Sequence, residues 1–227
     1  ADKAAATDAV LADLEATAQG RDPGPRWQKV FLPLRAAMRV HALPVQPFRN
    51  LIDAFIQDSG NPVYADRTHL LDYCRRSANP IGRLLLHLYR VDDERSLSQS
   101  DSICSALQLI NFWQDLSVDI PRRRFYLPHD LCQRFGVGQA DILAQRQTPN
   151  ATQLIAHCSA FARATMQSGV ELVHQIPGRA GWELRLVVQG GLRILDKIAA
   201  LNYATLRQRP TLRWWDVPVM LWRARWM

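Results

Sequence analysis

Several familiar features are missing from this chain of 227 residues. Its four cysteines, Cys74, Cys104, Cys132 and Cys158, form no Cys-x-x-Cys pair and have no His at zinc-site spacing, so neither a zinc module nor a disulfide framework is indicated. A Gly-rich dinucleotide fingerprint is absent, so no redox cofactor is expected. No uncharged apolar run approaches the roughly 18 residues that span a bilayer, and no secretory signal is visible. We therefore expect a cytoplasmic protein with reduced thiols.

Strand-like alternation is also scarce, whereas apolar residues recur with a helical period along most of the chain. The pattern predicts helices at residues 2–19, 26–42, 45–58, 66–89, 99–119, 151–174 and 180–208. Pro80 should kink or break the fourth of these helices, and the polar stretch 136–150 is predicted to be a surface loop. No linker divides the chain, so we expect a single all-α domain over residues 1–227 with a large core.

The charge of the chain is +7, which favours an anionic partner. Nucleic acid, an acidic membrane face and a phosphorylated substrate all satisfy this condition, and charge alone does not choose among them. The sequence does not indicate an oligomeric state.

The most informative segment is SICSALQLINFWQDLSVDIPRRRFYLP, residues 102–128. On a helix, Gln108, Asn111, Asp115 and Asp119 fall within an arc of about 80°, while apolar residues occupy the other faces. A helix that is apolar nearly all round should be buried. Because unpaired buried carboxylates are costly, the polar stripe must then face a cavity, a metal or a partner.

Two carboxylates one turn apart suit Mg²⁺, which keeps several waters and binds one or two carboxylates plus substrate phosphate oxygens. Arg122, Arg123 and Arg124 follow directly, and guanidinium groups bind phosphate oxygens in a bidentate manner. Taken alone, an Asp pair at this spacing is more often a solvated face and an Arg triplet a surface patch. Their combination with the amide stripe favours a diphosphate site.

A second segment, YCRRSANPIGRLLLHL, begins at Tyr73 and carries Arg75 and Arg76 before a run of small residues. Small residues allow close helix packing or leave room for a ligand. Without further context, ordinary packing with exposed arginines is the simpler interpretation.

Together these segments resemble the squalene/phytoene synthase family, which joins or rearranges prenyl diphosphates in an all-α bundle around a central cavity. The stretch LQLINFWQDLSVD is similar to the family's second aspartate-rich motif. This resemblance implies that Asp115, Asp119 and Asn111 bind Mg²⁺, with Gln108 lining the same site. The sequence RRRFYLP resembles the signature that follows, which implies Arg122 or Arg124 on the diphosphate and Tyr126 in the pocket wall.

The form of the two motifs most resembles a bacterial hydroxysqualene synthase branch of squalene and hopanoid biosynthesis. The resemblance implies a carbon–oxygen lyase that converts presqualene diphosphate and water to hydroxysqualene and diphosphate. Tyr73 and Phe112 would line the carbocation cavity, and Arg75 and Arg76 would contact the substrate. A condensing synthase that makes presqualene diphosphate, phytoene or dehydrosqualene is the alternative.

One departure from the family pattern concerns its first aspartate-rich motif, D-D-x-x-D-E. Asp2 matches the last Asp of that motif and is expected to be a metal ligand, whereas Lys3 stands where an acidic residue is usual. The rest of the motif and the helix before it are expected to lie upstream. A truncated scaffold without activity is therefore a second alternative.

The segment from Arg213 to Met227 interleaves four tryptophans with arginines, as interfacial segments do. Peripheral contact with the inner face of an anionic membrane and a helix packed on the domain are equally open. A nucleic-acid-binding module is disfavoured, because the arginines are scattered and the densest basic run adjoins the acidic stripe.

Overall fold

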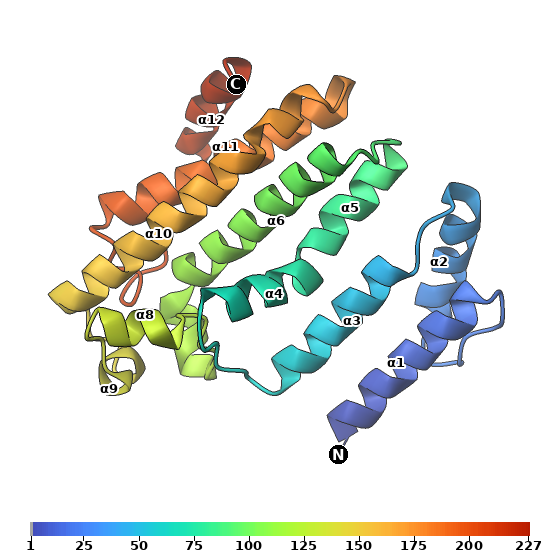
Figure 1. Cartoon of the computed structure of the whole chain (residues 1–227), viewed down its shortest axis with the longest axis horizontal. Coiled ribbons are helices and arrows are strands. Elements are labelled where there is room, and N and C mark those ends of the chain that lie inside the picture. The colour runs from blue at the N-terminus through green and yellow to red at the C-terminus, as the bar shows by residue number, and fades with distance from the viewer. Residues whose placement is uncertain (1) are drawn as a thin grey trace.

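The computed structural model describes the backbone of residues 2–227 and the side chains of residues 7–227. It is an all-α arrangement, which confirms the predicted fold class (Figure 1). The helices are α1 (Asp2–Ala18), α2 (Gln28–His41), α3 (Gln46–Ser59), α4 (Arg67–Ser77), α5 (Asn79–Leu88), α6 (Glu94–Gln114), α7 (Leu116–Asp119), α8 (His129–Arg134), α9 (Gln139–Leu143), α10 (Pro149–Gly169), α11 (Gly178–Ala200) and α12 (Val217–Arg225). Short 3₁₀ helices are η1 (Ile120–Arg122), η2 (Val170–His174) and η3 (Trp214–Asp216).

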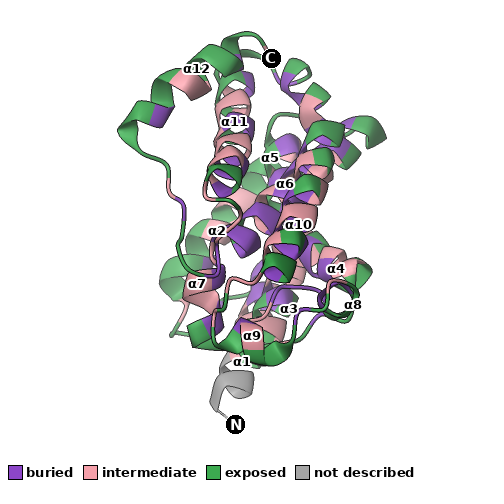
Figure 2. Ribbon diagram, turned by 90° about the vertical axis from the view of Figure 1, so that its left-hand side faces the viewer, coloured by how far each residue is buried: buried purple, intermediate pink, exposed green. Residues whose placement is uncertain are grey.

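Helix α6 is the centre of the molecule. It packs against α10, α5, α11 and α4, and its buried residues lie on several sides of the helix (Figure 2). Leu109 and Ala106 are fully buried, and Trp113 is 1% exposed. A smaller apolar cluster of Leu14, Phe31 and Ile52 holds α1, α2 and α3 together. The predicted burial of the central helix is therefore confirmed.

Close approach of α5 to α6 depends on a small residue. A Cβ at Gly82 would clash with the side-chain oxygen of Ser100 and the sulfur of Cys104. The predicted break at Pro80 is also confirmed, because α4 ends at Ser77 and α5 begins at Asn79. Proline is tolerated in the first turn of a helix, where its missing N–H would be unpaired anyway.

Side-chain caps set several helix starts. The Asp93 carboxylate accepts a hydrogen bond from the Ser96 N–H at 2.9 Å, so α6 begins at Glu94 and not at residue 99 as predicted. Thr148 caps α10 in the same way, accepting from the Ala151 N–H at 3.1 Å.

The predicted helix 180–208 is wrong at its C-terminal end. Helix α11 ends at Ala200, and Asn202 and Tyr203 adopt left-handed conformations with φ of 50° and 57°. The predicted helix 151–174 gives way to a 3₁₀ helix after Gly169. The predicted loop 136–150 contains the short helix α9, and α8 was not predicted. Helix α12 contacts α11, in agreement with the alternative in which the C-terminal segment is a helix packed on the domain.

Among the helices of residues 2–227, none is both long enough and apolar enough to cross a membrane.

Candidate active site

The polar stripe of α6 and α7 reaches the surface of an otherwise buried helix. Asn111 is exposed, and Gln108, Asp115 and Asp119 are partly exposed. The intervening Phe112 is only 4% exposed. The carboxylates and amides thus share the face that the sequence predicted, at the C-terminal end of the central helix.

The helix is interrupted within this stripe, whereas one continuous helix was predicted over residues 99–119. Asp115 ends α6 with φ −99° and ψ 11°, and α7 restarts at Leu116. The Asp119 N–H still donates to the Asp115 carbonyl at 2.8 Å, which keeps the two carboxylates one turn apart.

The arginine triplet leaves the helix through a tight turn. Arg123 adopts φ 60°, and the Arg124 N–H donates to the Asp119 carbonyl at 3.0 Å. Phe125 then forms a parallel bridge with Val63. This turn returns the chain toward the carboxylates, so that Arg122 and Arg124 both act electrostatically on Asp119.

A cluster of aromatic rings is buried at this end of the molecule. The Phe112 and Tyr126 rings stack with centroids 3.7 Å apart and planes 10° apart. Tyr73 lies 6.0 Å from Phe112, and Tyr64 lies 5.6 Å from Tyr73. Phe112 and Tyr73, which were predicted to line the cavity, and Tyr126, which was predicted in the pocket wall, therefore form one cluster, which also contains the unpredicted Tyr64.

Asp58 is a site residue that sequence reasoning missed. It lies near the end of α3, and the Tyr73 hydroxyl donates to its Oδ2 at 2.7 Å. Its Oδ1 is buried and has no hydrogen-bond partner among the described residues. Burial raises the pKa of Asp58, and the Tyr73 hydrogen bond and the charge of Arg124 oppose that rise. An Asp just before a Ser-Gly break looks like an ordinary helix end, so no local signal identified it.

Arg209 is a second site residue that was not predicted. Its Nε donates to Asp115 Oδ1 at 2.5 Å from the loop after α11. Burial and the neighbouring Asp115 raise the pKa of Asp119, whereas Arg124, Arg122 and Arg209 lower it. Three guanidinium groups therefore act on one carboxylate pair.

The other predicted arginines diverge. Arg76 donates to Gln57 Oε1 at 2.5 Å, next to Asp58, and so borders the aromatic cluster. Arg75 pairs with Asp72 at 3.3 Å and lines a separate cavity of about 410 Å³ with Arg83 and His87. The structure thus brings Arg76 near the site but not Arg75.

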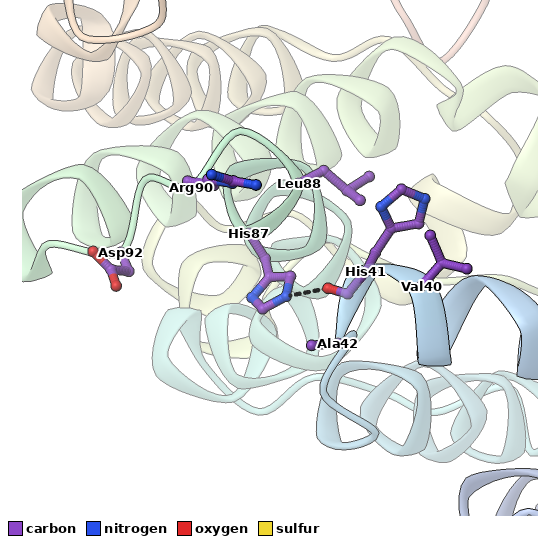
Figure 3. Close-up of a pocket in the computed structure, with 7 residues that line it drawn as sticks. All are labelled: Val40, His41, Ala42, His87, Leu88, Arg90 and Asp92. Carbon is purple, nitrogen blue, oxygen red and sulfur yellow. Dashed lines mark hydrogen bonds between the residues drawn. The ribbon is translucent and has the colours of Figure 1, made fainter.

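A further cavity of about 440 Å³ lies at the C-terminal end of α5 (Figure 3). There the His87 Nε2–H donates to the His41 carbonyl at 2.9 Å, and Arg90 and Asp92 border the opening. Helix α6 begins near this cavity, whereas Asp115 lies at the other end of the helix. The two ends are about 30 Å apart for a helix of this length.

The described residues supply only part of a metal-binding site. Within the part of the chain that the structure describes, no three His, Cys, Asp or Glu side chains form a cluster that could hold a metal ion. Asp115, Asp119 and Asn111 supply oxygen donors on one face, which suits a hard cation completed by substrate oxygens and water. The predicted ligand Asp2 lies outside the residues whose side chains are described.

The fold is that of helical enzymes that handle prenyl diphosphates. The sequence model of the squalene/phytoene synthase family matches residues 1–216, and the chain belongs to this family. A phytoene synthase from Thermus thermophilus is 31% identical over 220 residues, covering 96% of this chain and 74% of that protein. A hydroxysqualene synthase from Sinorhizobium fredii is 29% identical over 181 residues, covering 79% of this chain and 59% of that protein.

Solved structures agree on the fold. Squalene synthase HpnC from Alicyclobacillus acidocaldarius is similar with a TM-score of 0.83 and 33% identity, covering 89% of this chain and 76% of that one. A dehydrosqualene synthase in complex with a ligand has a TM-score of 0.77 at 17% identity, covering 97% of this chain and 77% of that one. The second likeness concerns the fold alone.

Proposed function

We propose that this protein ionises a prenyl diphosphate at the carboxylate stripe. The observation that carries the proposal is the convergence of Asp115 and Asp119 with Arg122, Arg124 and Arg209 beside a buried aromatic cluster. A site that combines carboxylates, guanidinium groups and an apolar wall suits a ligand with a diphosphate head and a hydrocarbon tail.

Mg²⁺ is the proposed cofactor, held by Asp115 and Asp119 with Asn111 as a further oxygen donor. When bound, it would neutralise charge that develops on the departing diphosphate. Arg122 and Arg124 would hold the diphosphate oxygens through charge-assisted hydrogen bonds, and Arg209 would exchange its present partner, Asp115, for the substrate.

The aromatic cluster would handle the hydrocarbon part. Loss of diphosphate leaves a carbocation, and the faces of Phe112, Tyr126 and Tyr73 carry the negative quadrupole that stabilises a cation. Their burial excludes bulk water, which would otherwise quench the cation at random. Asp58 would orient Tyr73 through the 2.7 Å hydrogen bond.

The specific reaction proposed is conversion of presqualene diphosphate and water to hydroxysqualene, diphosphate and a proton. The carbon–oxygen bond to diphosphate breaks, and one admitted water forms the new carbon–oxygen bond. The hydroxysqualene synthases among the relatives and the form of the two motifs support this choice. A head-to-head condensing reaction is the second candidate, favoured by the phytoene synthase relative.

A product assay tests the proposal. The purified protein is incubated with Mg²⁺ and either presqualene or farnesyl diphosphate, and the extract is analysed by mass spectrometry. We expect hydroxysqualene from presqualene diphosphate, and a fall in rate of about 10²-fold or more for Asp115→Asn. Asp101→Asn is the matched control, because Asp101 lies on the same helix but pairs with Arg83 far from the stripe.

If the protein condenses farnesyl diphosphate but leaves presqualene diphosphate intact, the second candidate replaces the proposed reaction. Equal rates for the Asp115 and Asp101 variants would remove the carboxylate stripe from the mechanism.

A further inference from the structure

The C-terminal segment presents large apolar side chains to the outside. Six residues of this segment are 41–78% exposed, and we call them the tryptophan surface: Trp214, Trp215, Val217, Leu221, Trp222 and Trp226. The tryptophans form two edge-to-face pairs, with ring centroids 5.6 Å apart in one and 5.7 Å in the other. Isolated exposed apolar residues are ordinary, but a run of this kind marks an interaction site.

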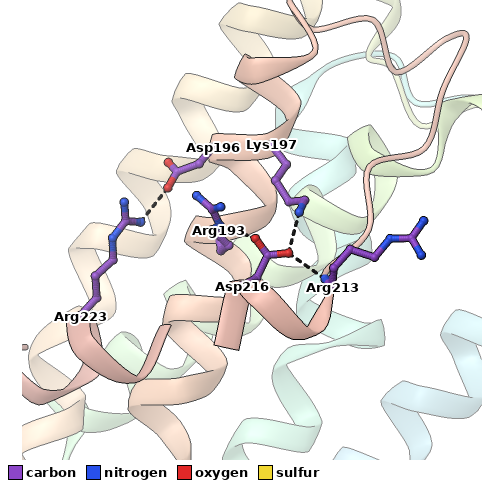
Figure 4. Close-up of polar contacts among 6 residues, drawn as sticks. All are labelled: Arg193, Asp196, Lys197, Arg213, Asp216 and Arg223. Atoms are coloured by element: carbon purple, nitrogen blue, oxygen red, sulfur yellow. Dashed lines mark hydrogen bonds and ion pairs between the residues drawn. The ribbon is translucent and has the colours of Figure 1, made fainter. Parts of the chain in front are cut away.

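This surface is fixed to the domain by buried charge (Figure 4). Asp216 is 0% exposed and accepts from Arg193 Nε at 2.8 Å, Lys197 Nζ at 2.5 Å and the Arg213 N–H at 2.7 Å. About two helical turns further along the chain, Arg223 pairs with Asp196 at 2.6 Å. The tryptophans therefore extend from an ordered segment, which reduces the backbone entropy that is lost when they meet a partner.

Helix α12 has the polarity of an interfacial helix. Met220, Ala224 and the paired Arg223 lie on the side that contacts α11. At 100° per residue, the opposite half of the helix carries Pro218, Val219, Leu221, Trp222 and Trp226, with Arg225 as its one charge. An outward half that is almost wholly apolar is expected to meet something other than water.

Positive charge borders the same surface. A cavity of about 380 Å³ beside Trp215 is lined by Arg193, Lys197, Arg209 and Arg213. Asp216 neutralises part of this charge, and Asp115 pairs with Arg209. The Arg213 guanidinium points away from Asp216, as Figure 4 shows. Arg225 adds a further cation next to Trp226, with its Cζ 5.8 Å from that ring.

We infer that the tryptophan surface docks on an anionic lipid bilayer. The indole rings would lie at the headgroup level, and Arg213 would receive a lipid phosphate beside Arg193 and Lys197. A second copy of the chain is a poorer occupant, because it would bring Arg213 and Arg225 against the same cations. The inference is independent of the proposed reaction, since binding to vesicles needs no substrate.

Vesicle co-sedimentation at low salt tests this docking. We expect binding to vesicles of phosphatidylglycerol and phosphatidylcholine, weak binding to phosphatidylcholine alone, and release at high salt. Replacing Trp214, Trp222 and Trp226 together by Ala should weaken binding roughly tenfold or more. The double change Arg213→Glu with Arg225→Glu should weaken it about twentyfold or more.

Matched controls separate this surface from general charge and hydrophobicity. Trp182→Ala removes a tryptophan that is 39% exposed on α11, and Arg39→Glu with Arg95→Glu makes the same charge change elsewhere. Both controls should bind as the parent does, and circular dichroism should show every variant folded. Absent binding, binding unaffected by the tryptophan changes, or equal loss in the controls would overturn the inference. A dimer in sedimentation equilibrium that the tryptophan changes dissociate would assign the surface to a second copy instead.

Discussion

At the scale of single residues, the least expected group is Asp58. Its carboxylate is partly buried, one oxygen is unpaired among the described residues, and burial raises its pKa. A group in this condition destabilises the fold, so its presence is better explained by the orientation of Tyr73 than by stability.

We therefore predict that Asp58→Asn stabilises the protein while slowing the reaction. An amide oxygen can still accept from the Tyr73 hydroxyl, but it carries no charge to desolvate. Because the pKa of Asp58 is raised in the folded state, its charged carboxylate destabilises the fold most at pH values above that pKa. The gain in melting temperature should be largest at neutral pH and should shrink as the pH falls through the folded-state pKa to below 4, where the carboxyl becomes protonated in both states.

Thermal unfolding at several pH values, together with steady-state kinetics, measures both effects. Asp53→Asn, an exposed position on the same helix, is the control. A pH-independent change in melting temperature would contradict the assigned cause.

At the scale of helices, the contact between α6 and α10 depends on Gly169. A Cβ there would clash with the Gln99 carbonyl and would lie 2.9 Å from Ile103 Cγ1. Backbone cannot move aside as the end of a flexible side chain can, so overpacking is expected to strain both helices.

Gly169→Ala should therefore lower the free energy of unfolding by about 1–3 kcal/mol, as measured by urea denaturation. Gly190→Ala is the matched control in α11, where the nearest atom, Met220 Cε, would be 3.5 Å from the new Cβ. That change should be neutral or stabilising by about 0.5–1 kcal/mol, because alanine favours a helix. Equal losses at the two positions would refute the packing argument.

The helices also show what the sequence could predict. Apolar periodicity and Pro or Gly breaks located α1 to α6 and α10 to within a few residues, apart from the start of α6 and the C-terminal ends of α6 and α10. They also predicted that Asn111, Asp115 and Asp119 share one accessible face. Those signals are local, because they depend on neighbours within a turn or two.

The errors depend on contacts between distant segments. Residues 201–208 follow a helical pattern, but the Ser117 N–H donates to the Thr205 carbonyl at 3.0 Å and holds this stretch against α7. The pairing of Asp58 with Tyr73 and that of Arg209 with Asp115 likewise join segments that no sequence spacing relates. Tertiary structure overrode local preference at these places.

At the scale of the whole molecule, Asp216 fixes the C-terminal segment to α11. Hydrogen bonds from Lys197, the Arg213 N–H and Arg193 hold its pKa well below the usual range. Because the folded-state pKa is depressed, the stabilisation is complete above the unfolded value near 4 and is lost as the pH falls below it.

Asp216→Asn should release this segment at neutral pH, because it removes the charge from two ion pairs and leaves Arg193 and Lys197 facing each other. Hydrogen exchange should accelerate in α12 and leave the central helix α6 protected. The control Asp92→Asn, at an exposed position, should change hydrogen exchange in neither helix. Acceleration across α6 as well would show that the ion pairs of Asp216 stabilise the whole fold instead.

The aromatic cluster also has an optical consequence. Three of the five tyrosines, Tyr64, Tyr73 and Tyr126, belong to it. Burial raises the pKa of all three, that of Tyr126 to about 12. Their ultraviolet absorbance therefore stays that of neutral phenol in alkaline solution until the rings separate. The molecule thus contains its own label-free indicator, in which tyrosinate formed by these three residues signals that the aromatic cluster has separated.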